Sequence, residues 1–154
     1  MREKKNVLFV CIGNSCRSPM AEGFARRYGS DVMEVYSAGL GPAPIIQSLT
    51  KKVMEAKNIN IDDLWPKDLA IIPTRNLDLV INMSGVKLPI RGRMPVRDWK
   101  IEDPIGKSEE VYVKVRDEIE AMVMKLIIEL REDAFKQYEN SPRGFFARLG
   151  RLRS

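Results

Sequence analysis

The first apolar segment of the chain is short and uninterrupted. Residues 6–10 read Asn-Val-Leu-Phe-Val, without the alternation of apolar and polar residues that marks a strand with one solvent-exposed face. This run predicts a parallel strand buried on both faces. From Ser18 to Tyr28 the apolar residues recur at helical spacing, with Ser18 as the expected N-cap, Pro19 at the first helical position and Gly29 at the end. The polar residues Glu22, Arg26 and Arg27 are expected on its outer face.

The same alternation of elements continues along the chain. Further strands are predicted at 32–36, 77–83 and 94–96, a helix at 45–57 and a short helix near 67–71. The clearest helical period begins at Ser108, and its apolar positions are Val111, Val115, Ile119, Met122, Val123, Leu126, Ile127 and Leu130. Because a strand-helix-strand order is the parallel crossover unit, we predict an α/β fold. The expected architecture is a single-domain four-stranded parallel sheet flanked by helices on both faces.

The predicted domain covers residues 1–131, and the helical period is lost beyond it. Residues 133–154 carry five basic and two acidic side chains and supply +3 of the net charge of +5. The core is thus only mildly basic, and we expect no nucleic-acid partner. We interpret residues 132–154 as a basic C-terminal tail that is flexible or forms a small amphipathic turn. Its aromatic and basic side chains could make a weak contact with a partner or a membrane surface.

Composition excludes several classes of protein. The 154 residues, 44% of them hydrophobic, suffice for one core, and no stretch approaches the roughly 20 apolar residues of a membrane span. Two cysteines close in sequence are typical of a reducing, cytoplasmic location rather than a disulfide scaffold. The absence of histidine removes Cys-His and Ser-His catalytic pairs and histidine-ligated zinc. We therefore expect neither a metal nor another cofactor.

The loop between the first strand and the first helix carries the candidate chemistry. Cys11 ends the strand, and Arg17 stands where the helix begins. First-turn amides have no intrahelical partners, and the helix dipole favours negative charge, so the loop predicts a phosphate-binding site. Gly13 permits the backbone angles of a tight loop, Asn14 and Ser15 can hydrogen-bond it into shape, and Arg17 offers a planar fork for two oxygens. Positive surroundings also favour the thiolate form of Cys11.

The segment from Cys11 through five residues to Arg17-Ser18 resembles the signature of low-molecular-weight protein tyrosine phosphatases and their arsenate reductase relatives. The resemblance continues through Met20-Ala21-Glu22, the Ser37-Ala38-Gly39 turn and the Asp103-Pro104 pair. It implies that Cys11 is the nucleophile, that Arg17 stabilises the transition state and that Asp103 is the general acid. The implied substrate-binding residues are Ile12, Gly13, Asn14, Ser15, Cys16, Arg17 and Ser18. Asn14 would hold the loop, and Ser18 would hydrogen-bond the thiolate.

Cys16 has three interpretations: loop packing, a metal ligand with Cys11, or a redox guard. Two cysteines without histidine cannot complete a zinc site in one chain, which argues against the metal. We hypothesise a reversible Cys11–Cys16 disulfide that protects the nucleophile under oxidation. Oxidative inactivation that a reducing thiol could not reverse would contradict this hypothesis.

Three functions are compatible with this loop. The main prediction is a cysteine-dependent phosphatase that hydrolyses phosphomonoesters, of phosphotyrosine proteins or small aryl phosphates, through a phosphocysteine intermediate. The first alternative is an arsenate reductase that uses an external small thiol, since residues 80–92 lack the two further cysteines of thioredoxin-coupled relatives. Trp99, four residues before Asp103, resembles the reductase pattern, and Ile105 stands where the phosphatases carry an aromatic residue. The second alternative is a non-catalytic phosphate- or phosphoprotein-binding module.

Overall fold

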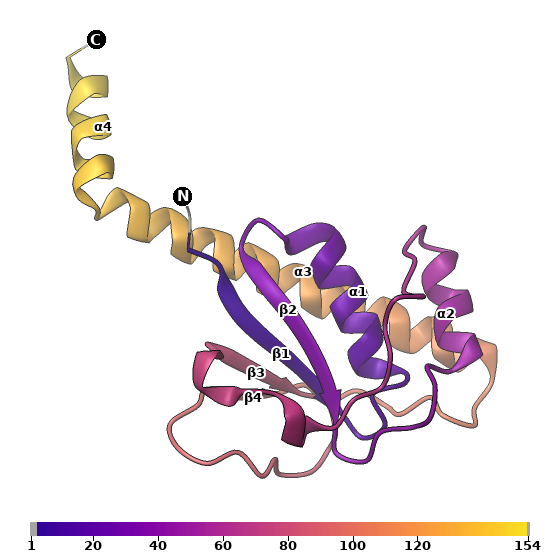
Figure 1. Ribbon diagram of the computed structural model, residues 1–154. Helices are drawn as coiled ribbons and strands as arrows, with labels where there is room; N and C mark the ends of the chain where they lie inside the picture. The colour runs from indigo at the N-terminus through magenta and orange to yellow at the C-terminus, as the bar shows by residue number, and fades with distance from the viewer. Residues whose placement is uncertain (1–2, 154) are drawn as a thin grey trace.

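The computed structural model describes residues 3–153. Met1 and Arg2, which begin the predicted domain, and Ser154, which ends the predicted tail, lie outside the described residues. The elements in chain order are β1 (Lys5–Cys11), α1 (Arg17–Gly29), β2 (Met33–Gly39), α2 (Ser48–Glu55), the 3-10 helices η1 (Leu69–Ile71) and η2 (Thr74–Asn76), β3 (Leu79–Asn82), β4 (Val96–Asp98), α3 (Glu109–Glu139) and α4 (Pro142–Leu152) (Figure 1).

The four strands form one parallel sheet in the order β2-β1-β3-β4, which confirms the predicted sheet. Cys11 pairs in register with Gly39, and Val10 pairs with Asn82. The carboxyl ends of three strands therefore meet at one edge, where parallel sheets place their ligand sites. The edge strand β4 occupies 96–98 rather than the predicted 94–96, because its pairing with β3 begins at Val96.

The two faces of the sheet are covered differently. Along β1, Val7, Phe9 and Cys11 join the core cluster that includes α1, α2 and α3, whereas Leu8 and Val10 join a smaller cluster on the opposite face. The connection from β2 to β3 first contributes α2 to the face of α1 and α3, and then η1, whose Leu69 joins the smaller cluster on the second face. The short helix predicted near residues 67–71 is the 3-10 helix η1 on the second face, so that face has much shorter helical cover than the face of α1, α2 and α3.

Helix α1 begins at Arg17, with Cys16 as its N-cap residue, so the expectation that Ser18 caps it is wrong. The hydroxyl of Ser18 is engaged elsewhere, since it lies 3.0 Å from Cys11 Sγ and accepts a hydrogen bond from Asn14 Nδ2 at 2.7 Å. Glu22 is buried rather than on an outer face. The start of α1 is therefore shaped by the loop before it rather than by capping.

Helix α3 has the predicted apolar side, and Ser108 Oγ accepts a hydrogen bond from Val111 N at its start. Val111 and Met122 are only half-buried, and Tyr112 is buried among the helices instead. The helix runs unbroken past residue 131 to Glu139, and α4 follows after a bend, so most of the predicted tail is helical. Figure 1 shows α4 projecting from the body. Over residues 3–153, no helix combines the length and apolarity needed to cross a bilayer.

Candidate active site

The loop from Cys11 to Arg17 folds around a small pocket at the carboxyl edge of the sheet. Cys11 is the last residue of β1, and Ser18, in the first turn of α1, brings its Oγ to 3.0 Å from Cys11 Sγ. The pocket has a volume of about 200 Å³ and is lined by Cys11, Ile12, Gly13, Ser15, Cys16, Arg17, Gly41, Ala43, Asp103 and Ile105. Every predicted site residue except Asn14 and Ser18 lines it. The side chains of those two residues are buried.

The backbone of the loop is held from outside through its carbonyl groups. Cys11 O accepts from Leu40 N, Ile12 O from Gly41 N, Gly13 O from Ala43 N and Ser15 O from Gln47 N, at 2.9 to 3.2 Å. Within residues 3–153, no protein acceptor takes the N–H groups of residues 12–16. With the carbonyls bonded away and the amides unoccupied, the loop can donate several hydrogen bonds to one anion.

Gly39 makes the close approach of the loop to β2 feasible. A Cβ at this position would lie 2.6 Å from Ile12 O and 2.9 Å from Asn14 N, both backbone atoms. No side chain fits there without moving the loop. The Ser37-Ala38-Gly39 segment, expected as a turn, is the end of β2, and the Cys11–Gly39 register pair places it beside Cys11.

Asn14 is the internal clamp of the loop. Its φ is +48°, in the left-handed region that asparagine tolerates better than most residues. Its Nδ2 donates to Ser18 Oγ at 2.7 Å and to Ser37 Oγ at 3.0 Å, and its Oδ1 accepts from Lys67 N at 3.0 Å. One side chain thus ties the loop to α1, to β2 and to the segment before η1.

Behind Asn14 lie the buried carboxyl group of Glu22 and the half-buried side chain of Lys67. Ser37 Oγ donates to Glu22 Oε2, and Lys67 Nζ lies 3.4 Å from Asn14 Oδ1. Burial raises the pKa of Glu22, while the Ser37 hydrogen bond and the Lys67 charge act the other way. Burial also lowers the pKa of Lys67. In the sequence, only the match of Met20-Ala21-Glu22 to the family pattern pointed to Glu22. No sequence feature pointed to Lys67 as part of the site.

Arg17 is locked in place although its charge faces the pocket. Its side chain is 5% exposed, Nη1 donates to Met83 O and to Ile101 O at 3.1 Å, and Nη2 lies 3.3 Å from Asp103 Oδ2. Its buried Nε has no partner within residues 3–153. Two carbonyls from distant segments therefore fix a guanidinium that keeps donor capacity for an oxyanion.

Asp103 and Cys16 lie in contrasting surroundings. The Asp103 side chain is 41% exposed, and its Oδ1 accepts from Ile105 N at 3.2 Å, so the carboxyl group stands at the mouth of the pocket. Cys16 is buried with Sγ 3.5 Å from Tyr112 Oη, and burial raises the pKa of its thiol. Both cysteines are free thiols, and the guard disulfide stays a prediction.

Metal ligands do not gather anywhere in the part of the chain that the structure describes: no three Cys, Asp or Glu side chains there are placed to share an ion. The pocket's own donors, the amides of residues 12–16 and Arg17, are all suited to an anion. The site is therefore arranged for a tetrahedral oxyanion next to a thiol.

Comparison with known proteins identifies the family to which a chain with this arrangement belongs. Residues 6–137 match the family described as low molecular weight phosphotyrosine protein phosphatase. The chain belongs to this family. It is 39% identical over 132 residues to the arsenate reductase of Shouchella clausii (strain KSM-K16), covering 79% of this chain and 94% of that protein.

Two solved structures of family relatives have the same fold. A structure described as an arsenate reductase in the phosphate binding state superimposes with a TM-score of 0.74 at 35% identity, covering 82% of this chain and 98% of the other. The YwlE arginine phosphatase from Geobacillus stearothermophilus gives a TM-score of 0.71 at 26% identity, covering 86% and 96%. The family thus includes proteins named for reduction of one oxyanion and for hydrolysis of a phosphate compound.

Proposed function

We propose that this protein is an arsenate reductase that takes its electrons from an external thiol. The observation that carries the proposal is the pocket: a small cradle of unoccupied amides and Arg17 around Cys11, rimmed by Gly41, Ala43 and Ile105. Such a rim has no aromatic wall to hold a phenyl ring, and it suits a free oxyanion. The similarity to the Shouchella clausii enzyme favours this alternative over the phosphatase that the sequence alone favoured.

The first step is nucleophilic attack by the Cys11 thiolate on arsenic. Ser18 stabilises the thiolate by its hydrogen bond at 3.0 Å, and the loop amides with Arg17 hold the arsenate oxygens. A Cys11 S–As bond forms, and one As–O bond breaks. Asp103, at the pocket mouth, gives its proton to the departing hydroxide, which leaves as water.

The second step transfers two electrons to arsenic. An external thiolate attacks Cys11 Sγ, the S–As bond breaks, and its electron pair stays on arsenic, which leaves as arsenite. Cys11 is left in a mixed disulfide, and a second external thiol releases it as a thiol while forming the external disulfide. The thiol is external because the only other cysteine, Cys16, is 3% exposed and directed toward Tyr112.

A phosphatase is the second candidate, and the placement of Asp103 favours it. A carboxylic acid 3.3 Å from Arg17 at the pocket mouth can protonate an alkoxide or phenoxide leaving group as the Cys11–phosphorus bond forms. The carboxylate can then accept a proton from the water that hydrolyses the phosphocysteine. This cycle needs no second thiol, in agreement with the missing cysteines at residues 80–92.

The deciding experiment measures both activities on the same preparations. Arsenite formation is followed with glutathione as the thiol, glutathione reductase being used to regenerate it, and hydrolysis is followed with an aryl phosphate. Wild type is compared with Cys11→Ser and Asp103→Asn, with Cys16→Ser as the matched thiol control. We expect arsenite formation that Cys11→Ser abolishes, that Asp103→Asn slows by about 10²–10³-fold and that Cys16→Ser leaves within a few-fold.

Three results would change the assignment. Aryl phosphate turnover without arsenite formation would move the assignment to the phosphatase. Arsenite formation that survives Cys11→Ser would contradict the mechanism for both candidates. Phosphate binding without turnover in either assay would favour the oxyanion-binding module.

A further inference from the structure

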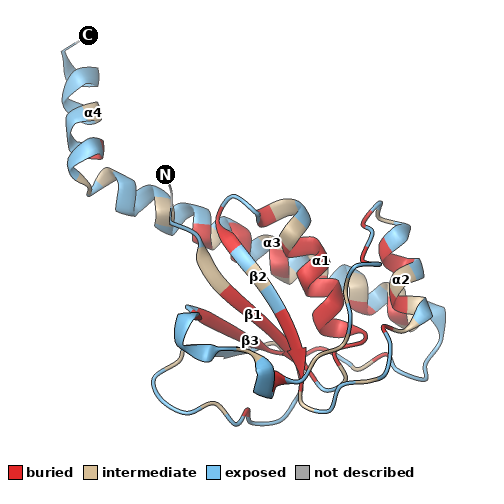
Figure 2. Ribbon diagram, in the orientation of Figure 1, coloured by how far each residue is buried: buried red, intermediate tan, exposed pale blue. Residues whose placement is uncertain are grey.

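Helix α4 carries a surface that the chemistry of the pocket does not use. It extends from Pro142 to Leu152, packs against the end of α3 and points away from the sheet (Figure 1). Most of its residues are exposed (Figure 2). An exposed terminal helix needs a reason for being ordered, since helices this short are marginal by themselves in water.

The bend that sets α4 is built from specific contacts. Ser141 caps the helix by accepting from Gly144 N at 3.1 Å, and Pro142 occupies its first turn. Gly144 lies so close to α3 that a Cβ there would overlap Tyr138 O. Arg148 Nη2 donates to Glu139 O at 2.8 Å. The direction of α4 is thus determined by its own sequence.

The exposed side of α4 is strongly apolar. Phe145, Leu149 and Leu152 follow one another at helical spacing on one face, with Phe146 beside them. Phe146 is 69% exposed and Leu152 is 83% exposed. The aromatic character continues into the last turns of α3, where Phe135 and Tyr138 line a hollow of about 500 Å³ at the bend.

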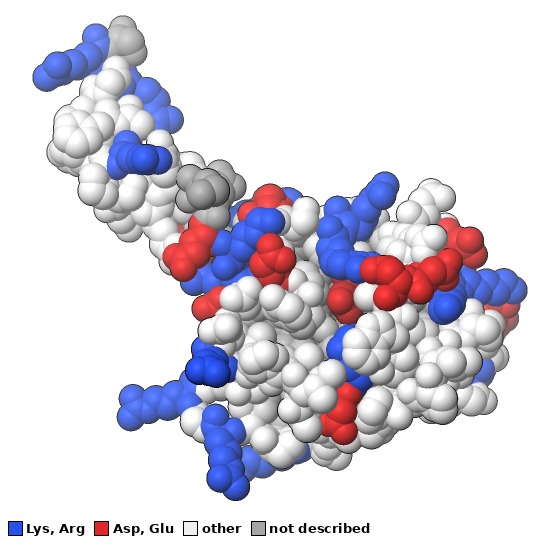
Figure 3. All heavy atoms as spheres, in the orientation of Figure 1, with Lys and Arg blue, Asp and Glu red and all other residues white. Residues whose placement is uncertain are grey.

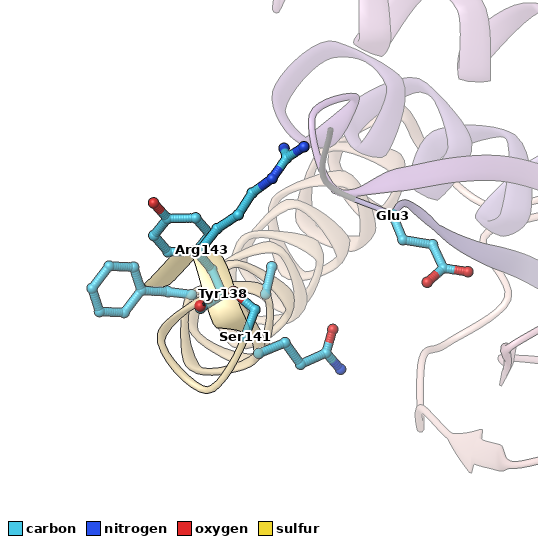
Figure 4. A pocket seen from close by; sticks show the side chains of 7 residues that line it. Glu3, Tyr138, Ser141 and Arg143 are labelled. Carbon is cyan, nitrogen blue, oxygen red and sulfur yellow. Dashed lines mark hydrogen bonds between the residues drawn. The ribbon is translucent and has the colours of Figure 1, made fainter. Parts of the chain in front are cut away.

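Figure 4 shows this hollow from close by, with Tyr138, Ser141 and Arg143 gathered at the bend and Glu3 apart from them. The half-exposed aromatic rings at the bend therefore adjoin the start of α4. The rings of Phe135 and Tyr138 add apolar surface beside the polar groups of the bend. Aromatic rings next to polar groups are typical of segments that lie at a membrane interface.

All the charges of α4 and of the residue after it have one sign. Four arginines lie there, Arg143, Arg148, Arg151 and Arg153, and no aspartate or glutamate. Figure 3 shows the projecting arm as blue and white spheres, whereas red and blue are mixed over the helices of the body. A cationic helix with an aromatic and aliphatic face has the composition of helices that lie in the headgroup region of anionic bilayers.

We infer that α4 docks the protein on an anionic membrane surface, with Phe145, Phe146, Leu149 and Leu152 entering the headgroup boundary and the arginines facing lipid phosphates. This inference is independent of the proposed function. The positive charge of the α4 arginines argues against the α4 helix of a second copy as the binding partner of this apolar face, because two such helices repel each other. Size argues against a protein partner: a helix of 11 residues is roughly 16 Å long and about 10 Å wide, so one face covers on the order of 160 Å², far short of the ~800 Å² per partner of a standard interface. A lipid surface requires no matching shape.

The test is co-sedimentation of the full chain with lipid vesicles. Vesicles of phosphatidylcholine alone are compared with vesicles containing about 30% phosphatidylglycerol, at low and high salt, because screening weakens surface attraction. The apolar variant is Phe145→Ser with Phe146→Ser. The charge variant is Arg151→Gln with Arg153→Gln, and its matched control is Arg91→Gln with Arg93→Gln, which removes the same charge from an exposed loop.

We expect binding only to the anionic vesicles and weaker binding at high salt. Phe145→Ser with Phe146→Ser should reduce the partition coefficient more than tenfold, and Arg151→Gln with Arg153→Gln by about 25-fold, at roughly fivefold per arginine. The loop control should change it by less than twofold. Equal sedimentation with both vesicle types, or equal losses in the two arginine pairs, would overturn the inference. A lipid-free dimer that the phenylalanine variant disperses would assign α4 to a second copy instead.

Discussion

The loop after β1 and the helix α4 hold their shapes in opposite ways. The loop is fixed by partners from five other parts of the chain: β2, the segment after it, α2, the segment before η1 and the start of α1. The bend before α4 depends on residues within nine positions of each other. A site that must aim several donors at one small anion needs long-range support, whereas a surface helix needs only a cap and a fixed direction. Substitutions should therefore have large functional effects around the loop and small ones in α4.

Arg17→Lys should have the largest effect. Lysine has no fork and cannot contact Met83 O, Ile101 O and Asp103 together, so the positive charge would lose its fixed position. We expect kcat/KM for the confirmed substrate to fall by about 10²–10³-fold. Steady-state kinetics will check this, with Arg148→Lys in α4 as the control that should stay within twofold. Equal losses in both variants would remove the contrast between the two regions.

Gly39→Ala should damage the loop through the backbone. The added Cβ would press on Ile12 O and Asn14 N, so we expect a loss of about 1–3 kcal/mol in the free energy of unfolding together with weaker phosphate binding. The matched change is Gly150→Ala in α4, where a Cβ meets nothing within 4 Å. That variant should be neutral or slightly more stable, because alanine favours helix. Denaturant titration and phosphate calorimetry measure both; unchanged phosphate affinity in Gly39→Ala would contradict the close-packing argument.

Glu22→Gln should alter how stability depends on pH. Because burial raises the pKa of Glu22 in the folded state, the folded protein holds a proton that the unfolded chain releases. Its contribution is complete below the ordinary carboxyl pKa and is lost as pH rises through the raised value. Ser37, Lys67, Arg26 and Asp63 are the groups that act on it. The stability of Glu22→Gln relative to wild type should therefore increase with pH.

The measurement for Glu22 is denaturant unfolding from pH 4 upward. Glu132→Gln on the exposed side of α3 serves as the matched charge control. A constant difference between Glu22→Gln and wild type across the range would show that the carboxyl group behind Asn14 does not titrate as described.

Ser141→Ala should have the smallest effect. Removing the cap of α4 costs about 1 kcal/mol of local helix stability and leaves the loop after β1 untouched. Hydrogen exchange should quicken at the amides of residues 144–152, with turnover unchanged. A fall in turnover would mean that α4 and the pocket are coupled.

The parts of the site that follow from local pattern could be predicted from the sequence. The buried strand ending at Cys11, the second strand running parallel to it and the placement of Arg17 at a helix start all depend on short-range periodicity and parallel topology. The Asp103 position could be predicted only through the family resemblance, because 85 residues separate it from Arg17 and no spacing rule connects them.

Other features depend on contacts that no pattern encodes. Ser18 looks like a helix cap, but Cys11 and Asn14 compete for its hydroxyl. Lys67 joins the site only because β2 brings the following segment under Asn14. The helix through residues 132–139 was missed because these residues lie outside the buried core, so the apolar period that identifies buried helices is absent although the residues favour helix.

The central claim is that Cys11 receives an oxyanion in the amide cradle and passes electrons from an external thiol. Mass spectrometry after mixing the protein with arsenate and one equivalent of reduced glutathione, so that no second thiol is present to release Cys11, tests it most directly. The account predicts one glutathione joined to Cys11, formed only when arsenate is present and absent when phosphate replaces it. An unmodified Cys11 under these conditions, or glutathione on Cys16 instead, would contradict it.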